Sequence, residues 1–284
     1  MQENWLTVKL VEEIHDAVQA GLPVASTVAS LQGATLPALL EYGCLRWALN
    51  SSTVPPLPQP LVSSPLGLAL SQVKSDLGLR TSGQQKGPQG HIDTQPVEFC
   101  VIQGQGELDE RPWQEFEIRF DHSAQGVGFR PLAAHGLQAA LHEMVDNALD
   151  HAQAPTAILV GYQVMNGIVL FSVADVGRGV LASLRSNPAY RHLQSDKDAV
   201  REALKDGVSR YGPSRGGLGF RQVFKALLAQ WGHLRFRSGN GSITMDGTDL
   251  DADKGEARYP PRLPGFQVTV CCRTSAATPP VPLV

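Results

Sequence analysis

An Asn-Gly dipeptide at positions 166 and 167 divides a long uncharged run, residues 156–174, into two β-rich arms, AILVGYQV and IVLFSV. The run approaches the length of a membrane span, but Gln163 and the Asn-Gly pair lie near its middle. Both central residues of a two-residue hairpin turn need positive φ angles, which asparagine and glycine adopt readily. The run therefore predicts two antiparallel strands joined by a tight turn.

Residues 96–273 carry a dense alternation of predicted elements around this hairpin. The apolar spacing predicts helices over 135–152, 196–206 and 220–231, and strands over 115–120 (EFEIRF), 233–237, 242–245 and 266–272. Helices alternating with mostly antiparallel strands indicate an α+β fold. We expect a two-layer α/β sandwich, in which one sheet carries its helices on one face.

The remaining segments differ in composition from this domain. Residues 1–50 predict a small helical N-terminal region, because LVEEIHDAV and LPALLEYGCLRWAL have helical apolar spacing. Residues 51–95 predict a linker region rich in Pro, Ser and Gln, since prolines interrupt helices and strand ladders. Residues 274–284 predict a disordered tail.

The composition argues against several classes of protein. The chain has 24 Lys and Arg against 27 Asp and Glu, a net charge of −3, so no overall basic field attracts nucleic acid or anionic lipid. The acidic N-terminus lacks the basic and apolar segments of a signal peptide, and the four cysteines form no CxxC pair. We expect a cytoplasmic protein with reduced thiols, no membrane association and no direct contact with nucleic acid.

The first candidate site lies on the helix predicted over 135–152. Glu143 and Asn147 are one turn apart at the polar margin of its apolar face. This pair suits magnesium chemistry, because an amide oxygen can bind a hard cation while a neighbouring carboxylate accepts a proton from an attacking water. Taken alone, the motif could equally be an ordinary solvated helix face.

The second candidate site follows the second arm of the hairpin. Asp175 stands at the strand end, and Gly177 and Gly179 follow it. A carboxylate there can accept a hydrogen bond from the exocyclic amine of adenine, and glycines let the backbone approach a ligand closely. An Asp-Gly turn after a strand is also common without any ligand.

The third candidate site is a glycine-rich loop over 212–219 that precedes the helix predicted over 220–231. Backbone N–H groups at the start of a helix bind phosphate, although the P-loop pattern G-x-x-x-x-G-K-[ST] is absent. The loop also matches the G-x-S-x-G of serine hydrolases at Ser214. No acidic residue separates Ser214 from His233, the only later histidine, so a catalytic triad in that order is not formed.

In this order, EMVDNA, DVGRG and GLGF resemble the motifs of the Bergerat-fold ATPases, the superfamily of gyrase, heat-shock chaperones, sensor histidine kinases and MutL. The resemblance covers residues 96–273 and implies that Asn147 binds Mg²⁺, that Asp175 binds the adenine of ATP and that Glu143 is the general base. It also implies that several residues shape the nucleotide site, namely Gly177, Gly179, Gly216, Gly217, Leu218 and Gly219.

The chain departs from this family at a late strand. Where family members usually carry a Gly-Thr pair, this sequence has Gly265-Phe266, so a hydroxyl near adenine is absent or comes from another position. A lid expected over 180–215 carries basic residues, one of which would stabilise charge on the γ-phosphate. They are Arg185, Arg191, Arg201, Lys205, Arg210 and Arg215.

The resemblance thus implies an Mg·ATP-binding protein that hydrolyses ATP slowly or transfers its γ-phosphate to a partner protein. The alternative is a non-catalytic module that reports ATP occupancy to a partner or downstream effector. Glu143 favours the enzyme, whereas the altered strand at Phe266 favours the module.

Overall fold

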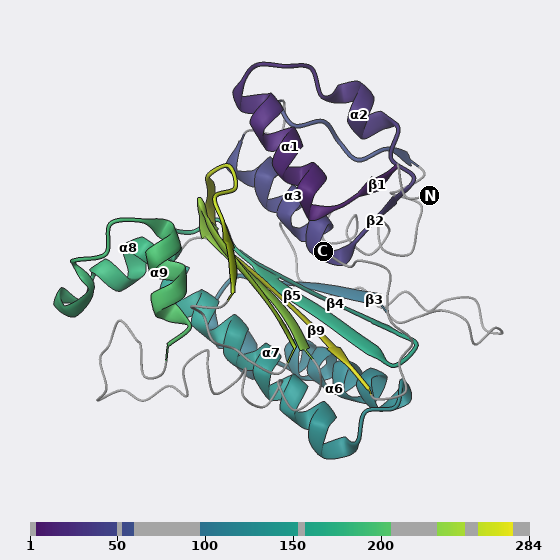
Figure 1. Cartoon of the computed structure of the whole chain (residues 1–284). Coiled ribbons are helices and arrows are strands. Elements are labelled where there is room, and N and C mark those ends of the chain that lie inside the picture. Colours follow the sequence, from purple (N-terminus) through teal and green to yellow (C-terminus); the bar gives the residue numbers. More distant parts are fainter. Residues whose placement is uncertain are drawn as a thin grey trace.

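The computed structural model describes residues 4–49, 53–59, 97–152, 157–205, 232–247 and 255–274. Its centre is one seven-stranded sheet with helices on both faces (Figure 1). Each pair of neighbouring strands in this sheet is antiparallel. The predicted α+β class is therefore confirmed.

The sheet has the strand order β3-β4-β5-β9-β6-β7-β8. Its strands are β3 (Val97–Ile102), β4 (Ile158–Met165), β5 (Ile168–Ala174), β6 (Gly232–Gly239), β7 (Gly241–Gly247), β8 (Glu256–Arg258) and β9 (Leu263–Arg273). β9 lies between β5 and β6, so a late segment of the chain completes the middle of the sheet. As a result Ala174 pairs with Gln267, and Gln267 pairs with Arg237.

The β4–β5 hairpin confirms the prediction from the Asn-Gly dipeptide. Met165 pairs with Ile168 across the turn. Asn166 and Gly167 have φ angles of 42° and 80°, the positive values that a two-residue turn requires. Because the turn is local, its two residues are sufficient to set the register of both strands.

The strand predicted over 115–120 is wrong, because this segment belongs to helix α6 (Arg111–Gly126). Pro112 lies in the first helical turn, and Trp113, Phe116 and Phe120 recur at helical spacing and are all buried. A run of six residues is too short to distinguish the apolar spacing of a helix from that of a strand. The first strand of the sheet is instead β3, and it pairs with β4.

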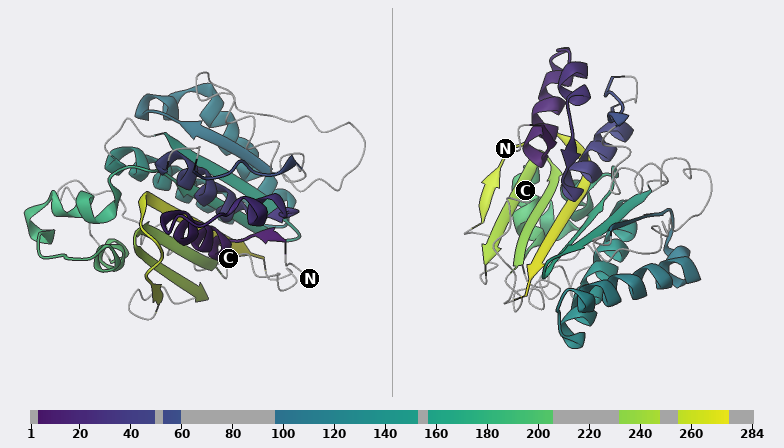
Figure 2. Two further views of the ribbon diagram at one scale, coloured as in Figure 1. Left: turned by 90° about the horizontal axis from the view of Figure 1, so that it is seen from above. Right: turned by 90° about the vertical axis from the view of Figure 1, so that its right-hand side faces the viewer.

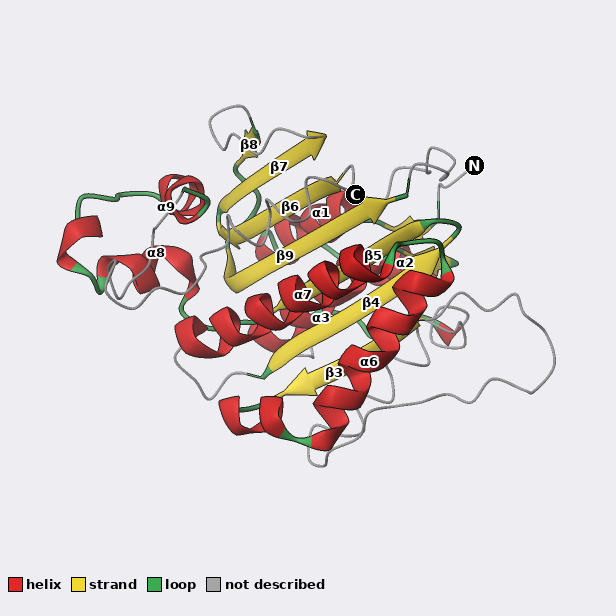
Figure 3. Ribbon diagram, turned by 90° about the horizontal axis from the view of Figure 1, so that it is seen from below, coloured by secondary structure: helices red, strands yellow, loops and turns green. Residues whose placement is uncertain are grey.

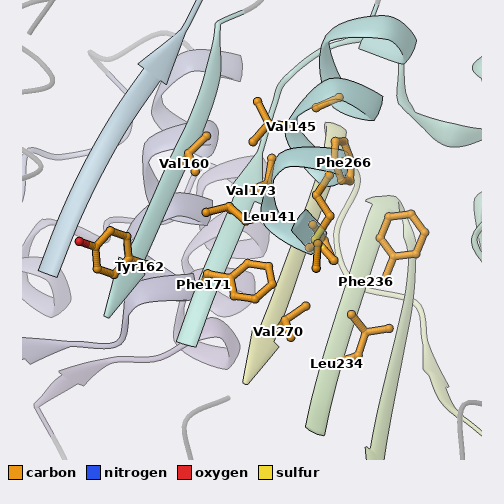
Figure 4. Close-up of a cluster of buried hydrophobic side chains, with 14 of the residues drawn as sticks. Leu141, Val145, Val160, Tyr162, Phe171, Val173, Leu234, Phe236, Phe266 and Val270 are labelled. Carbon is orange, nitrogen blue, oxygen red and sulfur yellow. The ribbon is translucent and has the colours of Figure 1, made fainter. Parts of the chain in front are cut away.

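Helix α7 (Pro131–Ala152) confirms the helix predicted over 135–152 and begins four residues earlier. Together with α6 it covers one face of the sheet (Figure 3). Leu141 and Val145 of α7 lie in the same buried cluster as Phe171 and Val173 of β5 (Figure 4). This packing fixes the position of the polar margin of α7 relative to the end of β5.

The opposite face of the sheet is covered by the N-terminal region, unlike the predicted two-layer sandwich (Figure 2). This region comprises β1 (Trp5–Leu6), α1 (Val8–Gln19), α2 (Ala25–Ala29), β2 (Gly33–Ala34) and α3 (Leu36–Ala48). Helix α3 packs on β4, β5 and β9, and α1 packs on α3. The reason is that the sheet residues on this face, such as Leu159, Leu170 and Cys271, are also apolar and need a cover.

The segment after β5 forms helices α8 (Gly179–Arg185) and α9 (Asp196–Ala203), which lie beside β6 and β7 at one side of the molecule (Figure 1). The Ser195 hydroxyl caps α9, because it accepts a hydrogen bond from the Asp198 amide at 3.1 Å. Short 3₁₀ helices cover Gln105–Asp109 and Pro188–Tyr190. Among the described helices, none combines the length and apolar character needed to cross a membrane.

Candidate functional site

Asp175 follows the last residue of β5, and only 2% of its surface is exposed. Its amide donates to the carbonyl of Phe266 at 2.9 Å, and its Oδ1 accepts a hydrogen bond from the Gly177 amide at 2.6 Å. Burial raises the pKa of its carboxyl from 3.8 to about 7, although backbone hydrogen bonds to the carboxyl from Gly177 and then Phe266 act to lower the pKa. The carboxyl therefore changes charge near neutral pH, where a further donor from a ligand would favour the ionised form.

Two glycines let the backbone approach Asp175 and the end of α7. Gly265 has a φ angle of 79°, and a Cβ there would overlap the carbonyl oxygen of Asp175. A Cβ at Gly177 would lie 2.7 Å from the carbonyl oxygen of Ala152, the last residue of α7. The loop after β5 is thus held directly against the C-terminal end of this helix.

The side chains of Glu143 and Asn147 contact each other on α7, as their spacing predicts. Asn147 Nδ2 donates to the Glu143 carbonyl at 2.7 Å and to Glu143 Oε1 at 3.0 Å. Because Nδ2 faces two acceptors, Oδ1 of Asn147 is turned away from Glu143. An amide oxygen in this orientation fits a hard cation such as Mg²⁺, with the Glu143 carboxylate adjacent to it.

Arg178 joins the two motifs, a role that the sequence did not indicate. Its amide donates to the carbonyl of Ala152 at 3.2 Å, and its Nε donates to the carbonyl of His151 at 2.9 Å. A cation at the C-terminal end of a helix interacts favourably with the helix dipole. Asn147 lies five residues before Ala152, about 7–8 Å along the helix axis. The structure therefore brings the Glu143–Asn147 pair and the Asp175 loop to the same part of the molecule.

Ser238 of β6 supplies a hydroxyl beside Gly265 and Phe266. Its Oγ donates to the Gly265 carbonyl at 2.8 Å and accepts a hydrogen bond from the Val180 amide at 2.9 Å. A Cβ at Gly179 would lie 2.9 Å from this oxygen, so glycine is required there. The Ser238 side chain thus holds backbone groups of the two segments at Gly265 and Val180.

The third predicted motif falls outside the residues that the structure describes. This applies to Gly216, Gly217, Leu218 and Gly219, and to Arg210 and Arg215 of the expected lid. The described part of that lid packs against the sheet, and the Asp196 carboxylate at the start of α9 accepts a hydrogen bond from the Asn240 amide at 3.1 Å. Arg185 and Arg191 are exposed, and Lys205 pairs with Glu202 at 2.7 Å.

Within the described ranges, no group of three His, Cys, Asp or Glu side chains is arranged to hold a metal ion. All four cysteines are buried.

No protein-family model matches this chain, and no curated protein matches its sequence. A functional assignment for the chain therefore depends on its own residues and geometry.

Proposed function

We propose that this protein is a Bergerat-fold ATPase or kinase that binds Mg·ATP between the Asp175 loop and the polar margin of α7. The observation that carries the proposal is the buried Asp175 carboxyl, whose pKa lies near 7 and whose loop contacts the end of the helix bearing Glu143 and Asn147. The order of helix α7, hairpin, Asp-Gly loop and returning strand β9 supports this assignment.

Each residue has a distinct role in this proposal. Asp175 accepts a hydrogen bond from the adenine amine, and Oδ1 of Asn147 would hold the metal ion. When bound, Mg²⁺ would neutralise charge on the β- and γ-phosphates. Glu143 accepts a proton, either from water in hydrolysis or from a hydroxyl of a partner protein in phosphoryl transfer. In the family that the chain resembles, a glycine-rich loop encloses the phosphates. The matching glycines here, within 216–219, lie outside the described residues.

A non-catalytic, ATP-gated interaction module is the second candidate. It is favoured by the position of α3, which packs on β5 and β9 directly behind the Asp175 loop. Nucleotide occupancy at Asp175 would then reach the N-terminal helices and a partner bound to them. In such a module Glu143 would have no role in turnover.

Calorimetric titration of Mg·ATP at pH 8 tests the nucleotide site. We expect Asp175→Asn to weaken binding by about tenfold to a hundredfold, the effect of losing one hydrogen bond to a charged group. Asp198→Asn, which removes an exposed acid on α9, is the control and should bind as the wild type does. Equal affinity of Asp175→Asn and the wild type would show that the site is misassigned.

Phosphate release separates the two functions. An enzyme should release phosphate from ATP alone, or transfer it when its partner is added, and Glu143→Ala should abolish either reaction while ATP still binds. ATP binding without turnover in the wild type, alone and with proteins that co-purify with it, would instead support the module.

A further inference from the structure

A buried charged cluster joins α3 to the sheet on the face opposite α7. Arg235 and Arg237 of β6 both donate to the carboxylate of Glu41 in α3, with 2.8 Å between Arg237 Nη1 and Glu41 Oε2. The exposed fractions of these three residues are 4%, 1% and 1%. Glu12 of α1 accepts a further hydrogen bond from Arg235 at 2.9 Å. Docking of α1 and α3 therefore helps to orient the two guanidinium groups, together with the Pro261 carbonyl, which accepts a hydrogen bond from Arg237 Nη2.

Arg237 is also the cross-strand neighbour of Gln267 in β9. These residues are directly paired across β6 and β9, so their Cβ atoms lie about 5 Å apart on the same face of the sheet. Arg237 Nε and Gln267 Oε1 are both buried, and neither has a hydrogen-bond partner within the part of the chain that the structure describes. The neighbouring side chains thus carry a donor on Arg237 and an acceptor on Gln267.

Gln267 in turn holds the backbone of the candidate site. Its Nε2 donates to the carbonyl of Asp175 at 3.1 Å and to the carbonyl of Pro264 at 3.3 Å. Two carbonyl acceptors define the orientation of the amide, with Oε1 turned away from both. The Asp175 amide also donates to the Phe266 carbonyl. Both the amide and the carbonyl of Asp175 are therefore hydrogen-bonded to residues of β9.

An electrostatic observation connects the same two layers. Burial raises the pKa of the Cys44 thiol in α3, and the negative charges of Asp175 and then Glu41 raise it further. Asp175 therefore lies within electrostatic range of α3, although its carboxyl belongs to the site on the α7 side.

We propose that Gln267 is a positioning residue that couples docking of the N-terminal helices to the geometry of the Asp175 loop. While Glu41 holds Arg237, Gln267 keeps the Asp175 carbonyl and the turn at Gly265 in place. When a partner draws α1 and α3 away, Arg237 loses its carboxylate and the support of Gln267 is weakened. The effect on nucleotide affinity rests on the proposed function, and it is reciprocal: bound nucleotide strengthens helix docking.

Hydrogen exchange in the nucleotide-free protein tests the coupling through peptides that span residues 175–180. Gln267→Met removes both hydrogen bonds and keeps the volume, whereas Glu41→Gln acts from α3 and serves if the first variant does not fold. We expect about fivefold faster exchange in both, the change that weakening the single hydrogen bond to the Asp175 carbonyl produces in local opening.

Two control variants remove comparable interactions elsewhere. Thr269→Val breaks the buried hydroxyl pair between Ser172 and Thr269 (2.8 Å) on the same strand and face as Gln267. Glu98→Gln breaks the partly buried pair between Glu98 and Arg119 (2.9 Å). Both should leave exchange over 175–180 unchanged.

Equal acceleration in the controls would show that Gln267 is only structural, and an unchanged Glu41→Gln would show that the N-terminal helices are not coupled to the loop. Titration with Mg·ATP then tests the consequence: Gln267→Met and Glu41→Gln should bind about fivefold more weakly than either control. A wild type that binds no Mg·ATP contradicts the proposed function, while the exchange result still decides the coupling.

Discussion

A Cβ atom on residue 265 would overlap the carbonyl oxygen of Asp175. The backbone of Gly265 also has a φ angle of 79°, which residues with a side chain rarely adopt. β9 therefore approaches the end of β5 more closely than any side chain permits. This contact sets the position of the Asp175 carboxyl relative to α7.

Gly265→Ala is expected to lower the free energy of unfolding by about 2–4 kcal/mol, because strain at positive φ adds to the overlap with Asp175. Gly21→Ala is the matched control: Gly21 has a φ angle of 69°, but nothing lies within 4 Å of the position that a Cβ would occupy there. Strain alone should cost about 1 kcal/mol at this residue. Equal losses in urea denaturation would show that the contact with Asp175 is not tight.

The stability of the protein should depend on Asp175 between pH 4 and pH 7. The folded-state pKa is raised from 3.8 to about 7 by burial, so the folded form favours the protonated carboxyl. Its stabilising effect is complete below pH 3.8 and is lost as the pH rises through about 7. Relative to Asp175→Asn, the wild type should therefore lose up to about 4 kcal/mol over this range.

Denaturant unfolding of the two proteins at several pH values measures this difference. The gap between the unfolding free energies should widen from pH 4 to pH 7 and stay constant above about pH 8. A gap that does not change with pH would mean that the carboxyl is hydrated in the folded protein.

Asn147→Asp should lower the free energy of unfolding by about 1–2 kcal/mol without added metal. The new carboxylate faces the carbonyl and the Oε1 atom of Glu143, where Nδ2 now donates to both. If this site binds magnesium, millimolar Mg²⁺ should restore part of the loss in the variant. Urea denaturation with Mg²⁺ and with EDTA measures the effect, and an identical curve in both would contradict a cation site at this pair.

His142 should stabilise the contact between α6 and α7 at acidic pH. Its Nδ1 lies 2.9 Å from Glu117 Oε1, and this hydrogen bond is the main cause of its raised pKa. The stabilisation is present below pH 6.5 and is lost as the pH rises through the raised value. Because His142 is half-exposed, solvent screening limits the effect to less than about 1 kcal/mol.

Comparing His142→Gln with the wild type by thermal unfolding checks this expectation. The variant should lose more stability at pH 5.5 than at pH 8.5, whereas His192→Gln, at an exposed histidine of the 188–195 segment, controls for removal of an imidazole. A greater loss of stability in His142→Gln at pH 8.5 than at pH 5.5 would contradict this expectation.

The elements predicted correctly are those whose signals are local. The Asn166–Gly167 turn and the apolar face of α7 each depend on residues within a few positions of one another. Helix α6 shows the limit, because a short run with mixed spacing fits both periods until its packing against the sheet decides.

The candidate site was predictable only in part. Glu143, Asn147 and Asp175 carry motif signals, and the glycines at 216–219 stay a prediction because they lie outside the described residues. Gln267 and Arg178 act through backbone carbonyls that no sequence pattern marks. Likewise Glu41 meets Arg235 across 194 residues of chain, and such buried pairs are visible only once the fold brings them together.

The position of β9 has a consequence for the order in which the protein is made. Residues 263–273 form the inner strand β9. The edges of β5 and β6 that face β9 therefore have no partner strand until this late segment has left the ribosome. Pairing across such sequence distances is slow, and open strand edges invite aggregation. Nascent chains that stop before Gly265 should therefore depend on chaperones and carry a solvated Asp175, and only translation through β9 generates the adenine-binding carboxyl proposed above.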